Sequence, residues 1–298
     1  MTKLNLMALR HSAFYSPYLM TMAGGYLKQA GFDVNYTVQT PDQPVKDRLL
    51  DGRCHISQSA VAAGFASLEN HQPDTIRHFA QINSRDGFFI AARHAAWHAA
   101  SSFNWSDLAG KQVLVDHFFQ PMAMFKYALF KQGVDWNSLQ VIDAGDVNQI
   151  DNTFRHGSGD YVHQQGPAPQ QLEADGLASV VASVGETIGP IAFSSLCATK
   201  EFLKSDIAIE FLALYKKSLT QCQQNDSEDI TRQLQNYGFL TDIDFKVLNN
   251  TIKTYQALGC WKHDGNIGSE EYETLLDVFE YSQLISKRHT AKLLIKTI

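Results

Sequence analysis

The chain has 298 residues, enough for two domains or one large α/β unit, and 44% of its residues are apolar while 19% are charged. This composition excludes a disordered chain, and the formal net charge of −6 gives no basic footprint for nucleic acid or an anionic membrane. The longest uncharged stretch, residues 12–27, contains a proline and two adjacent glycines and falls short of the ~20 mostly apolar residues of a membrane-spanning helix.

Strand and helix patterns alternate along the first third of the chain. Alternating apolar residues predict strands, while an early proline and a closing glycine are typical of helices. The predicted strands are residues 3–9, 33–38, 54–57, 75–81 and 87–93. The predicted helices are residues 16–30, 44–52 and 60–69.

The same alternation returns after residue 111. Further strands are predicted at residues 112–115, 138–143, 160–163, 178–183 and 191–199. Helices are predicted between them at residues 121–132, 147–156 and 168–175, and then at 207–223, 227–236, 243–257, 270–281 and 287–295. This order indicates an α/β fold with mostly parallel strands.

The two halves of the chain share their order of elements. The segments "GFDVNYTVQT…VKDRLLDGRCHI" and "GVDWNSLQVIDA…IDNTFRHGSGDYV" both run from a helix end through a strand and a short helix to a glycine and a short strand. We therefore expect two lobes joined by two hinge crossings. One lobe comprises residues 1–92 and 193–298, including the C-terminal helices, and the other comprises residues 93–192.

Several segments resemble the substrate-binding proteins of ABC importers for nitrate, sulfonate and thiamine-precursor pyrimidines, the NMT1/THI5-like group. They are "HSAFYSPYLMTMAGGYLKQAGFDV", "RLLDGRCHISQSA", "DLAGKQVLVDHFFQPMAMFKYALFKQGVDW", "GDYVHQQGPAPQQLE" and "YQALGCWKHDGNIGSEEYETLLDV". The resemblance implies a type II periplasmic-binding-protein fold, in which two α/β lobes hold a small-molecule ligand in a cleft. It also implies an ABC permease as partner. We expect a monomer with no cofactor, no nucleic-acid partner and no membrane insertion.

The chain departs from that group at its N-terminus and in its cysteines. Residues 3–9 alternate like a strand and do not have the form of a secretion signal, so we expect a cytoplasmic protein, or a periplasmic one if a leader has been removed. His94 and His98 have helical spacing but lack a third metal ligand, so no metal site is expected. Four scattered cysteines are interpreted as buried thiols: Cys54, Cys197, Cys222 and Cys260.

Ligands of open α/β sheets bind beyond the carboxyl ends of the strands, so the residues that follow strands are the candidates for ligand binding. In the first lobe, aromatic rings could stack on a planar ligand while an imidazole, amide or hydroxyl holds its edge. The alternative roles are packing beneath a loop for Tyr18, helix capping for Ser59 and support of a turn for Asn83. The first-lobe candidates are His11, Ser12, Tyr15, Tyr18, Gln58, Ser59 and Asn83.

In the second lobe, an acid and a histidine follow a strand and precede a helix. Asp116 and His117 could hydrogen-bond an aminopyrimidine; alternatively, Asp116 could cap the helix while Phe118 packs in the core. Gln164 and Gln165 stand where members of the resembled group often carry a glutamate, which argues against a cationic ligand. The second-lobe candidates are Asp116, His117, Phe118, Gln120, Tyr161 and Gln165.

Two functions remain open. The preferred one is solute binding without catalysis, because aromatic, amide and hydroxyl groups dominate the candidates; the expected ligand is a planar, largely neutral heterocycle, with aminopyrimidine the first choice. The alternative is a cytoplasmic enzyme on the same fold, in pyrimidine and thiamine biosynthesis or in a chorismate-dehydratase-like elimination. That enzyme would need His11, Asp116 or His117 as its general base.

Overall fold

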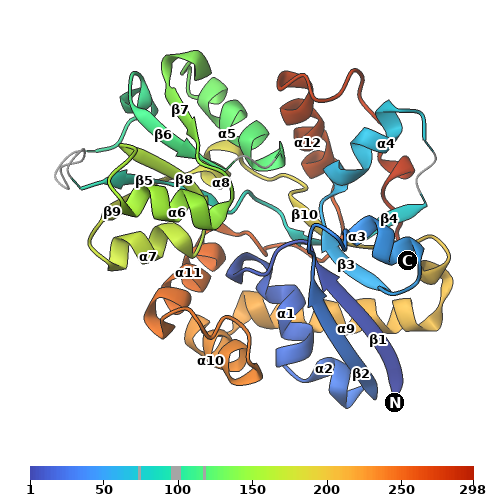
Figure 1. The fold of residues 1–298 in the computed structure, drawn as a ribbon. Helices are drawn as coiled ribbons and strands as arrows, with labels where there is room; N and C mark the ends of the chain where they lie inside the picture. Colours follow the sequence, from blue (N-terminus) through green and yellow to red (C-terminus); the bar gives the residue numbers. More distant parts are fainter. Residues whose placement is uncertain (73–74, 95–101, 117–118) are drawn as a thin grey trace.

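The computed structural model describes residues 1–72, 75–94, 102–116 and 119–298, which form two lobes side by side (Figure 1). The sheet of the first lobe has the strand order β2-β1-β3-β10-β4. Its strands are β1 (Thr2–Ala8), β2 (Phe32–Val38), β3 (Ile56–Ser59), β4 (Ile76–Asn83) and β10 (Ser194–Thr199). β10 runs antiparallel to both of its neighbours, while β1, β2 and β3 are parallel.

The second lobe repeats this topology with the order β7-β6-β8-β5-β9. Its strands are β5 (Phe88–Arg93), β6 (Gln112–Val115), β7 (Gln140–Asp143), β8 (Tyr161–Gln165) and β9 (Ala178–Ser183). Here β5 is the antiparallel strand, and it pairs with β8 and β9. The prediction of a two-lobed α/β fold with mostly parallel sheets is therefore confirmed.

Helices flank both sheets. The first lobe has α1 (Ser16–Ala23), α2 (Tyr26–Gln29), α3 (Val45–Leu50), α4 (Phe65–Glu69), α9 (Asp206–Gln224), α10 (Ser227–Tyr237), α11 (Phe245–Leu258) and α12 (Ser269–Tyr281). The second lobe has α5 (Phe119–Lys131), α6 (Val147–Arg155), α7 (Ala168–Ala174) and α8 (Val184–Ile188). The C-terminal helices also reach across, because α11 contacts α7 and α12 contacts α5.

Short 3-10 turns complete the described elements. They are η1 (Ala13–Tyr15), η2 (Val61–Gly64), η3 (Trp105–Leu108), η4 (Trp136–Ser138), η5 (Phe202–Lys204) and η6 (Ala291–Leu293). The predicted helix at residues 287–295 is wrong, since only η6 forms there. The segment instead lies along the edge of the first sheet, where Ile295 bridges to His78 of β4.

Local capping explains where the C-terminal helices begin and end. The side chains of Ser205, Asp226 and Asp244 accept backbone N–H groups at the starts of α9, α10 and α11. α10 and α11 end at Gly238 and Gly259, which adopt the left-handed conformation with φ of 99° and 71°. These boundaries agree with the predicted ones to within two residues.

The chain crosses between the lobes twice. Residues 84–87 lead from β4 to β5, and residues 189–193 lead from α8 back to β10. The strand at residues 88–93 therefore belongs to the second sheet, whereas the expected division kept residues up to 92 in the first lobe. Two strands joined by a short turn look like a hairpin in sequence, but this turn is the first crossing.

Two further findings concern the cysteines and the helices of the described residues. All four cysteines are free and buried, as predicted. Among the described helices, none combines the length and the apolar character that a membrane span requires.

Candidate functional site

Two adjoining cavities lie between the lobes. The inner cavity has a volume of about 180 Å³ and the outer one about 590 Å³. Leu9, Arg10 and Gln165 line both cavities, so the two meet at these side chains. The inner cavity is further lined by Tyr15, Gln58, Ala60, Ala62, Ala63, Phe88, Phe119, Gln120, Pro121, Phe193 and Ser194.

Sheet topology explains why these residues meet. The carboxyl ends of β1 and β6 face the cleft and are followed by Leu9–Arg10 and Asp116. β5 and β10 each run antiparallel to their neighbours, so their N-terminal ends lie at the cleft edges of the two sheets. Phe88 and Phe193 lie at these ends. The site thus stands at the sheet edge at which ligands of open α/β folds bind.

An ion pair joins the lobes across the cleft. The guanidinium of Arg10 donates from Nη1 and Nη2 to both carboxylate oxygens of Asp116, at 3.1–3.2 Å. The Asp116 side chain is 2% exposed and the Arg10 side chain 17% exposed. Such two-pronged contacts are strong and fix orientation. The pair therefore joins the two walls of the cleft and places a carboxylate beside the one cation among the described lining of the inner cavity.

Gln58 of β3 holds the loop that carries Arg10. Its Oε1 accepts the backbone N–H groups of Leu9, at 3.0 Å, and Arg10, at 3.2 Å. The side chain is 1% exposed and also lines the inner cavity. This amide fixes the first-lobe wall as well as bounding the cavity.

The inner cavity is largely aromatic. Phe88 and Phe193 are buried, whereas Phe119 is 54% exposed at the mouth. Tyr15 is 4% exposed, and burial raises the pKa of its hydroxyl, which keeps it protonated. Its oxygen lies 3.5 Å from Nε2 of Gln165, a long and weak contact that leaves both groups able to bond to a ligand.

Gln120, near the start of α5, contributes the polar group of the second-lobe wall. Its Nε2 donates to the carbonyl of Phe193, on the second crossing, at 2.9 Å. Its Oε1 is buried and accepts no hydrogen bond from the described part of the chain. A buried carbonyl without a partner is costly, so this atom is suited to accept a donor from a ligand.

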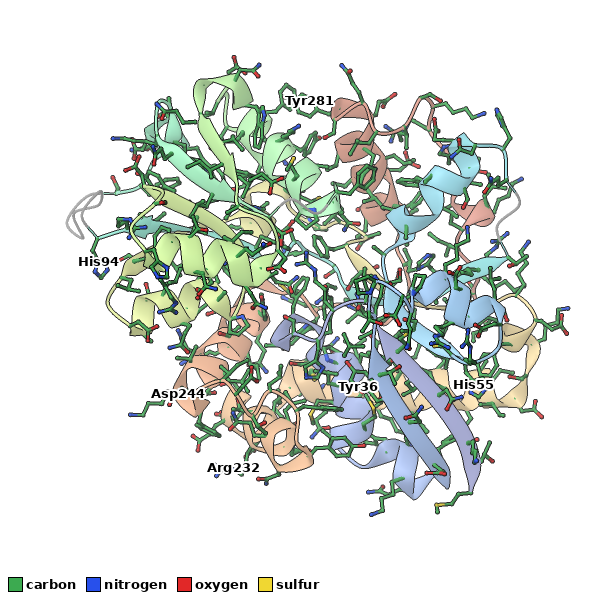
Figure 2. The ribbon with its side chains drawn as sticks, in the orientation of Figure 1. Tyr36, His55, His94, Arg232, Asp244 and Tyr281 are labelled. Carbon is green, nitrogen blue, oxygen red and sulfur yellow. The ribbon has the colours of Figure 1, made fainter. Side chains whose placement is uncertain are left out.

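The outer cavity is more polar. Nδ1 of His11 lies 2.9 Å from the hydroxyl of Tyr36 on β2, a residue near the centre of Figure 2. Burial lowers the pKa of His11, and nearby Asp242 opposes this effect. Asp146, Asp151 and Asp242 are the acids of this lining.

Two buried ionisable groups are coupled electrostatically to the ion pair. Burial raises the pKa of the Asp86 carboxyl to about 8, and the charge of Asp116 adds to this, although the backbone N–H of Phe88 donates to Oδ1. Burial and the charge of Arg10 lower the pKa of His163 to about 3. The His163 ring lies between Phe88 and Phe125, with centroid distances of 4.8 and 4.6 Å.

Most of the predicted site residues lie at the cleft. Those that line at least one cavity are His11, Ser12, Tyr15, Gln58, Gln120 and Gln165. Asp116 lines neither cavity itself but hydrogen-bonds to Arg10, which lines both. Ser12 also supports the loop, because its Oγ accepts the N–H of Phe14 and donates to the carbonyl of Gly166.

Besides Asp116, four described candidates line neither cavity. The Tyr18 hydroxyl donates to the carbonyls of Met7 and Ile56 inside the first lobe. Asn83 donates to the carbonyl of Phe14 and accepts from Ser194, and so supports a crossing. Ser59 and Tyr161 are 5% and 2% exposed and lie within β3 and β8. The predicted residues His117 and Phe118 lie outside the described residues.

Sequence reasoning missed the aromatic walls and the ion pair. Arg10 follows the first predicted strand and precedes the candidate His11, but its partner lies 106 residues away. Phe88 and Phe193 stand at the beginnings of antiparallel strands, so a search for residues that follow strands passes over them. The signal that could have found them is the crossing itself, because both lie at a junction between the lobes.

The enzyme alternative depends on a general base at the cleft. Of the candidate bases, Asp116 is held by Arg10, His11 lies in the outer cavity, and His117 is outside the described residues. Burial raises the pKa of the Cys54 thiol to about 12, which keeps it protonated.

The fold and the interlobe cleft define a two-lobed periplasmic-binding-protein fold. No family model matches the chain. Among curated proteins, "Putative binding protein YtlA" of Bacillus subtilis (strain 168) is 26% identical over 306 residues, which cover 98% of this chain and 90% of that protein.

Solved structures with the same fold include binding components of transport systems. The alkanesulfonate-binding protein SsuA from Xanthomonas axonopodis pv. citri, bound to MOPS, has a TM-score of 0.74 at 12% identity and covers 100% of this chain and 99% of that one. The ligand-binding component of an ABC-type import system from Staphylococcus aureus, with zinc bound, has a TM-score of 0.75 at 12% identity and covers 100% and 97%. Within the described chain, no group of three or more His, Cys, Asp or Glu is placed to hold a metal ion.

Proposed function

We propose that the protein is the solute-binding component of an ABC-importer-like system, of the NMT1/THI5-like group, and that it closes on a small, planar, uncharged heterocycle. An aminopyrimidine of the kind from which thiamine is built is the first choice. The single observation that carries this proposal is the buried Gln120 Oε1, which lines an aromatic cavity and has no partner in the described chain. The names of the relatives, a binding protein and a component of an import system, support the transport role.

The charge of the inner cavity favours an uncharged ligand. Among the described residues of its lining, Arg10 alone carries a charge, and the Asp116 carboxylate already lies 3.1 Å from its guanidinium. An incoming anion would have to displace a buried carboxylate that stands in the best position for Arg10. A neutral ligand avoids this competition.

The shape and chemistry of the lining favour a planar heterocycle. Phe88, Phe119 and Phe193 offer aromatic surface for a flat ring. The amino group of an aminopyrimidine can donate to Oε1 of Gln120, and its ring nitrogens can accept from Nε2 of Gln165 or from the hydroxyl of Tyr15. The match requires donors and acceptors on one small ring, which aminopyrimidines carry.

A ligand panel tests the proposal. Native mass spectrometry of the purified chain should reveal a retained small molecule, and thermal-shift titration with a hydroxymethyl-aminopyrimidine should raise the Tm with ligand concentration, as linkage requires. Ethanesulfonate and nitrate should give no comparable shift. Stabilisation by the sulfonate or by nitrate, together with none by any pyrimidine, overturns the assignment of the ligand.

Closure of the lobes is part of the proposed function. Only the segments 84–87 and 189–193 carry the main chain between the sheets, so few backbone dihedrals need to change for the lobes to rotate. Small-angle scattering should give a smaller radius of gyration when the ligand is bound. An unchanged radius with demonstrated binding would indicate a preformed pocket instead.

A further inference from the structure

A further hollow, separate from the two interlobe cavities, lies on the first lobe at the end of the sheet opposite the cleft. It has a volume of about 280 Å³, and it is lined by Arg77, Lys200, Lys204, Lys292, Ile295 and Lys296. Five of these six residues are cationic, in a chain whose net charge is −6. β10 begins at the inner cavity with Ser194 and ends at Thr199, directly before Lys200, so the two sites stand at opposite ends of one strand. We call this site the lysine hollow.

Three chain segments build the lysine hollow, and backbone hydrogen bonds fix each one. The N–H of Lys200 donates to the carbonyl of Thr75 at 2.8 Å, and the N–H of Lys296 donates to the carbonyl of His78 at 2.9 Å. Leu294 is fully buried against Gly64 and anchors the C-terminal segment between its two lysines. The lysine side chains therefore extend from a rigid frame rather than from a loose tail.

Three of the lysine charges in the hollow have no ion-pair partner among the described residues. Lys200, Lys292 and Lys296 form no ion pair with any described residue, and the described lining contains no carboxylate. Lys204 contacts Glu201 at 2.7 Å, but the two side chains are 69% and 84% exposed, so water and salt screen that pair. Arg77 is 7% exposed, and its Nη1 donates to the carbonyl of Ile76.

We propose that the lysine hollow binds a polyvalent phosphate group. Several ammonium groups converging on one concave site repel one another, and a polyvalent anion relieves that repulsion. Ammonium groups bind phosphate oxygens as point charges from several directions and need no planar geometry. Two sources supply this chemistry: a soluble polyphosphate, or the phosphate headgroups of an anionic lipid surface, which would hold the protein beside a membrane.

Charge-matched variants of the full-length chain test this proposal. The hollow variant is Lys200→Gln/Lys292→Gln/Lys296→Gln, and the control variant is Lys28→Gln/Lys246→Gln/Lys253→Gln. The control removes the same charge from exposed lysines of α2 and α11. One arm titrates pyrophosphate by calorimetry at low salt. The other arm sediments the protein with vesicles of phosphatidylcholine, with and without phosphatidylglycerol.

The wild-type chain should bind pyrophosphate, phosphatidylglycerol vesicles or both. The affinity of the hollow variant should be lower by about tenfold or more, while the control variant should keep the wild-type affinity. Loss in the pyrophosphate arm identifies a soluble ligand, and loss in the vesicle arm alone identifies a lipid surface. Equal loss in both variants, or no binding of either probe by the wild-type chain, overturns the proposal. Melting curves and ligand binding at the interlobe cleft should be the same in all three proteins.

Discussion

The two walls of the inner cavity differ in how far their polar groups are satisfied. In the first lobe, Oε1 of Gln58 accepts two backbone N–H groups and fixes the loop that carries Arg10. In the second lobe, Oε1 of Gln120 is also buried and accepts none from the described residues. The Gln58 carbonyl is thus satisfied within the protein, whereas the Gln120 carbonyl has a hydrogen-bonding capacity that no described residue uses.

This difference does not come from the fold, because the two lobes have the same sheet topology. β1 and β3 correspond to β6 and β8, and in each sheet an antiparallel strand follows the third strand in spatial order. The contrast lies in two individual side chains, Gln58 on β3 and Gln120 on α5. Matched variants of the two walls should therefore separate the groups that stabilise the fold from those that bind the ligand.

The largest change in stability is expected for Asp86, on the first crossing between the lobes. Asp86→Asn keeps an acceptor for the N–H of Phe88 and removes a carboxyl whose pKa rises from 3.8 when unfolded to about 8 when folded. Between these values the native state holds a proton that the unfolded chain releases, so this group lowers stability as pH rises toward 8. A shift of this size corresponds to an effect on the order of several kcal/mol.

Urea unfolding of both proteins from pH 4 to pH 9 checks this expectation. The variant should gain stability relative to the wild type up to about pH 8 and then keep a constant advantage. A difference that is flat across the whole range would mean that Asp86 is ionised in the folded protein.

The next largest effect should follow Asp116→Asn, which breaks the link between the walls. The loss should be about 3 kcal/mol, at the low end for a buried pair, because the Arg10 side chain is 17% exposed. Ligand preference should also change, since the cavity then carries an unbalanced positive charge. Thermal shifts should show new stabilisation by ethanesulfonate; a variant that still prefers uncharged ligands would remove the basis for the charge argument.

A smaller loss of stability is expected for Gln58→Leu in the first wall. The variant leaves the N–H of Arg10 without its side-chain acceptor, at a cost of about 2 kcal/mol, while the N–H of Leu9 keeps the backbone carbonyl of residue 58 at 3.2 Å. Denaturant midpoints with an unchanged m-value measure this cost. A stability equal to that of the wild type would show that water replaces Gln58 in the loop.

The smallest stability effect is expected for Gln120→Leu in the second wall. The variant loses one hydrogen bond, to the carbonyl of Phe193, at about 1 kcal/mol. Ligand affinity, in contrast, should fall about tenfold, because the buried acceptor for the ligand is gone. Calorimetric titration compares this variant with Gln58→Leu, and a weaker ligand affinity in Gln58→Leu than in Gln120→Leu would reverse the assignment of the two walls.

Local sequence patterns predict most of the elements but not the ends of three strands. The expected ends at residues 57, 81 and 163 fall short, because β3 continues to Ser59, β4 to Asn83 and β8 to Gln165. The extra residues pair with antiparallel strands from distant parts of the chain: Gln58 lies opposite Leu196, and Gln165 lies opposite Phe88. Local periodicity does not reveal a strand partner that is distant in sequence, so polar residues inside these strands resemble loop residues.

The candidate site was predictable where a side chain follows a parallel strand, as His11, Tyr15 and Asp116 do. Buried polar residues are harder to assign from sequence. Tyr18 and Asn83 have the same chemistry as ligand-binding residues, yet their polar atoms hydrogen-bond to the protein itself. Which partner such a group finds is decided by packing in three dimensions.

The position of β10 has a consequence for how the protein is assembled. The strands of the second sheet all lie between residues 88 and 183, so that lobe can form from one continuous stretch. The first sheet is different, because β4 is hydrogen-bonded to β10, a strand that begins at Ser194. During synthesis from the N-terminus, β4 cannot pair with β10 until the whole inserted lobe has been synthesised. The lobe that is begun first is therefore finished last, and its unpaired strand is the part of the nascent chain most exposed to wrong partners.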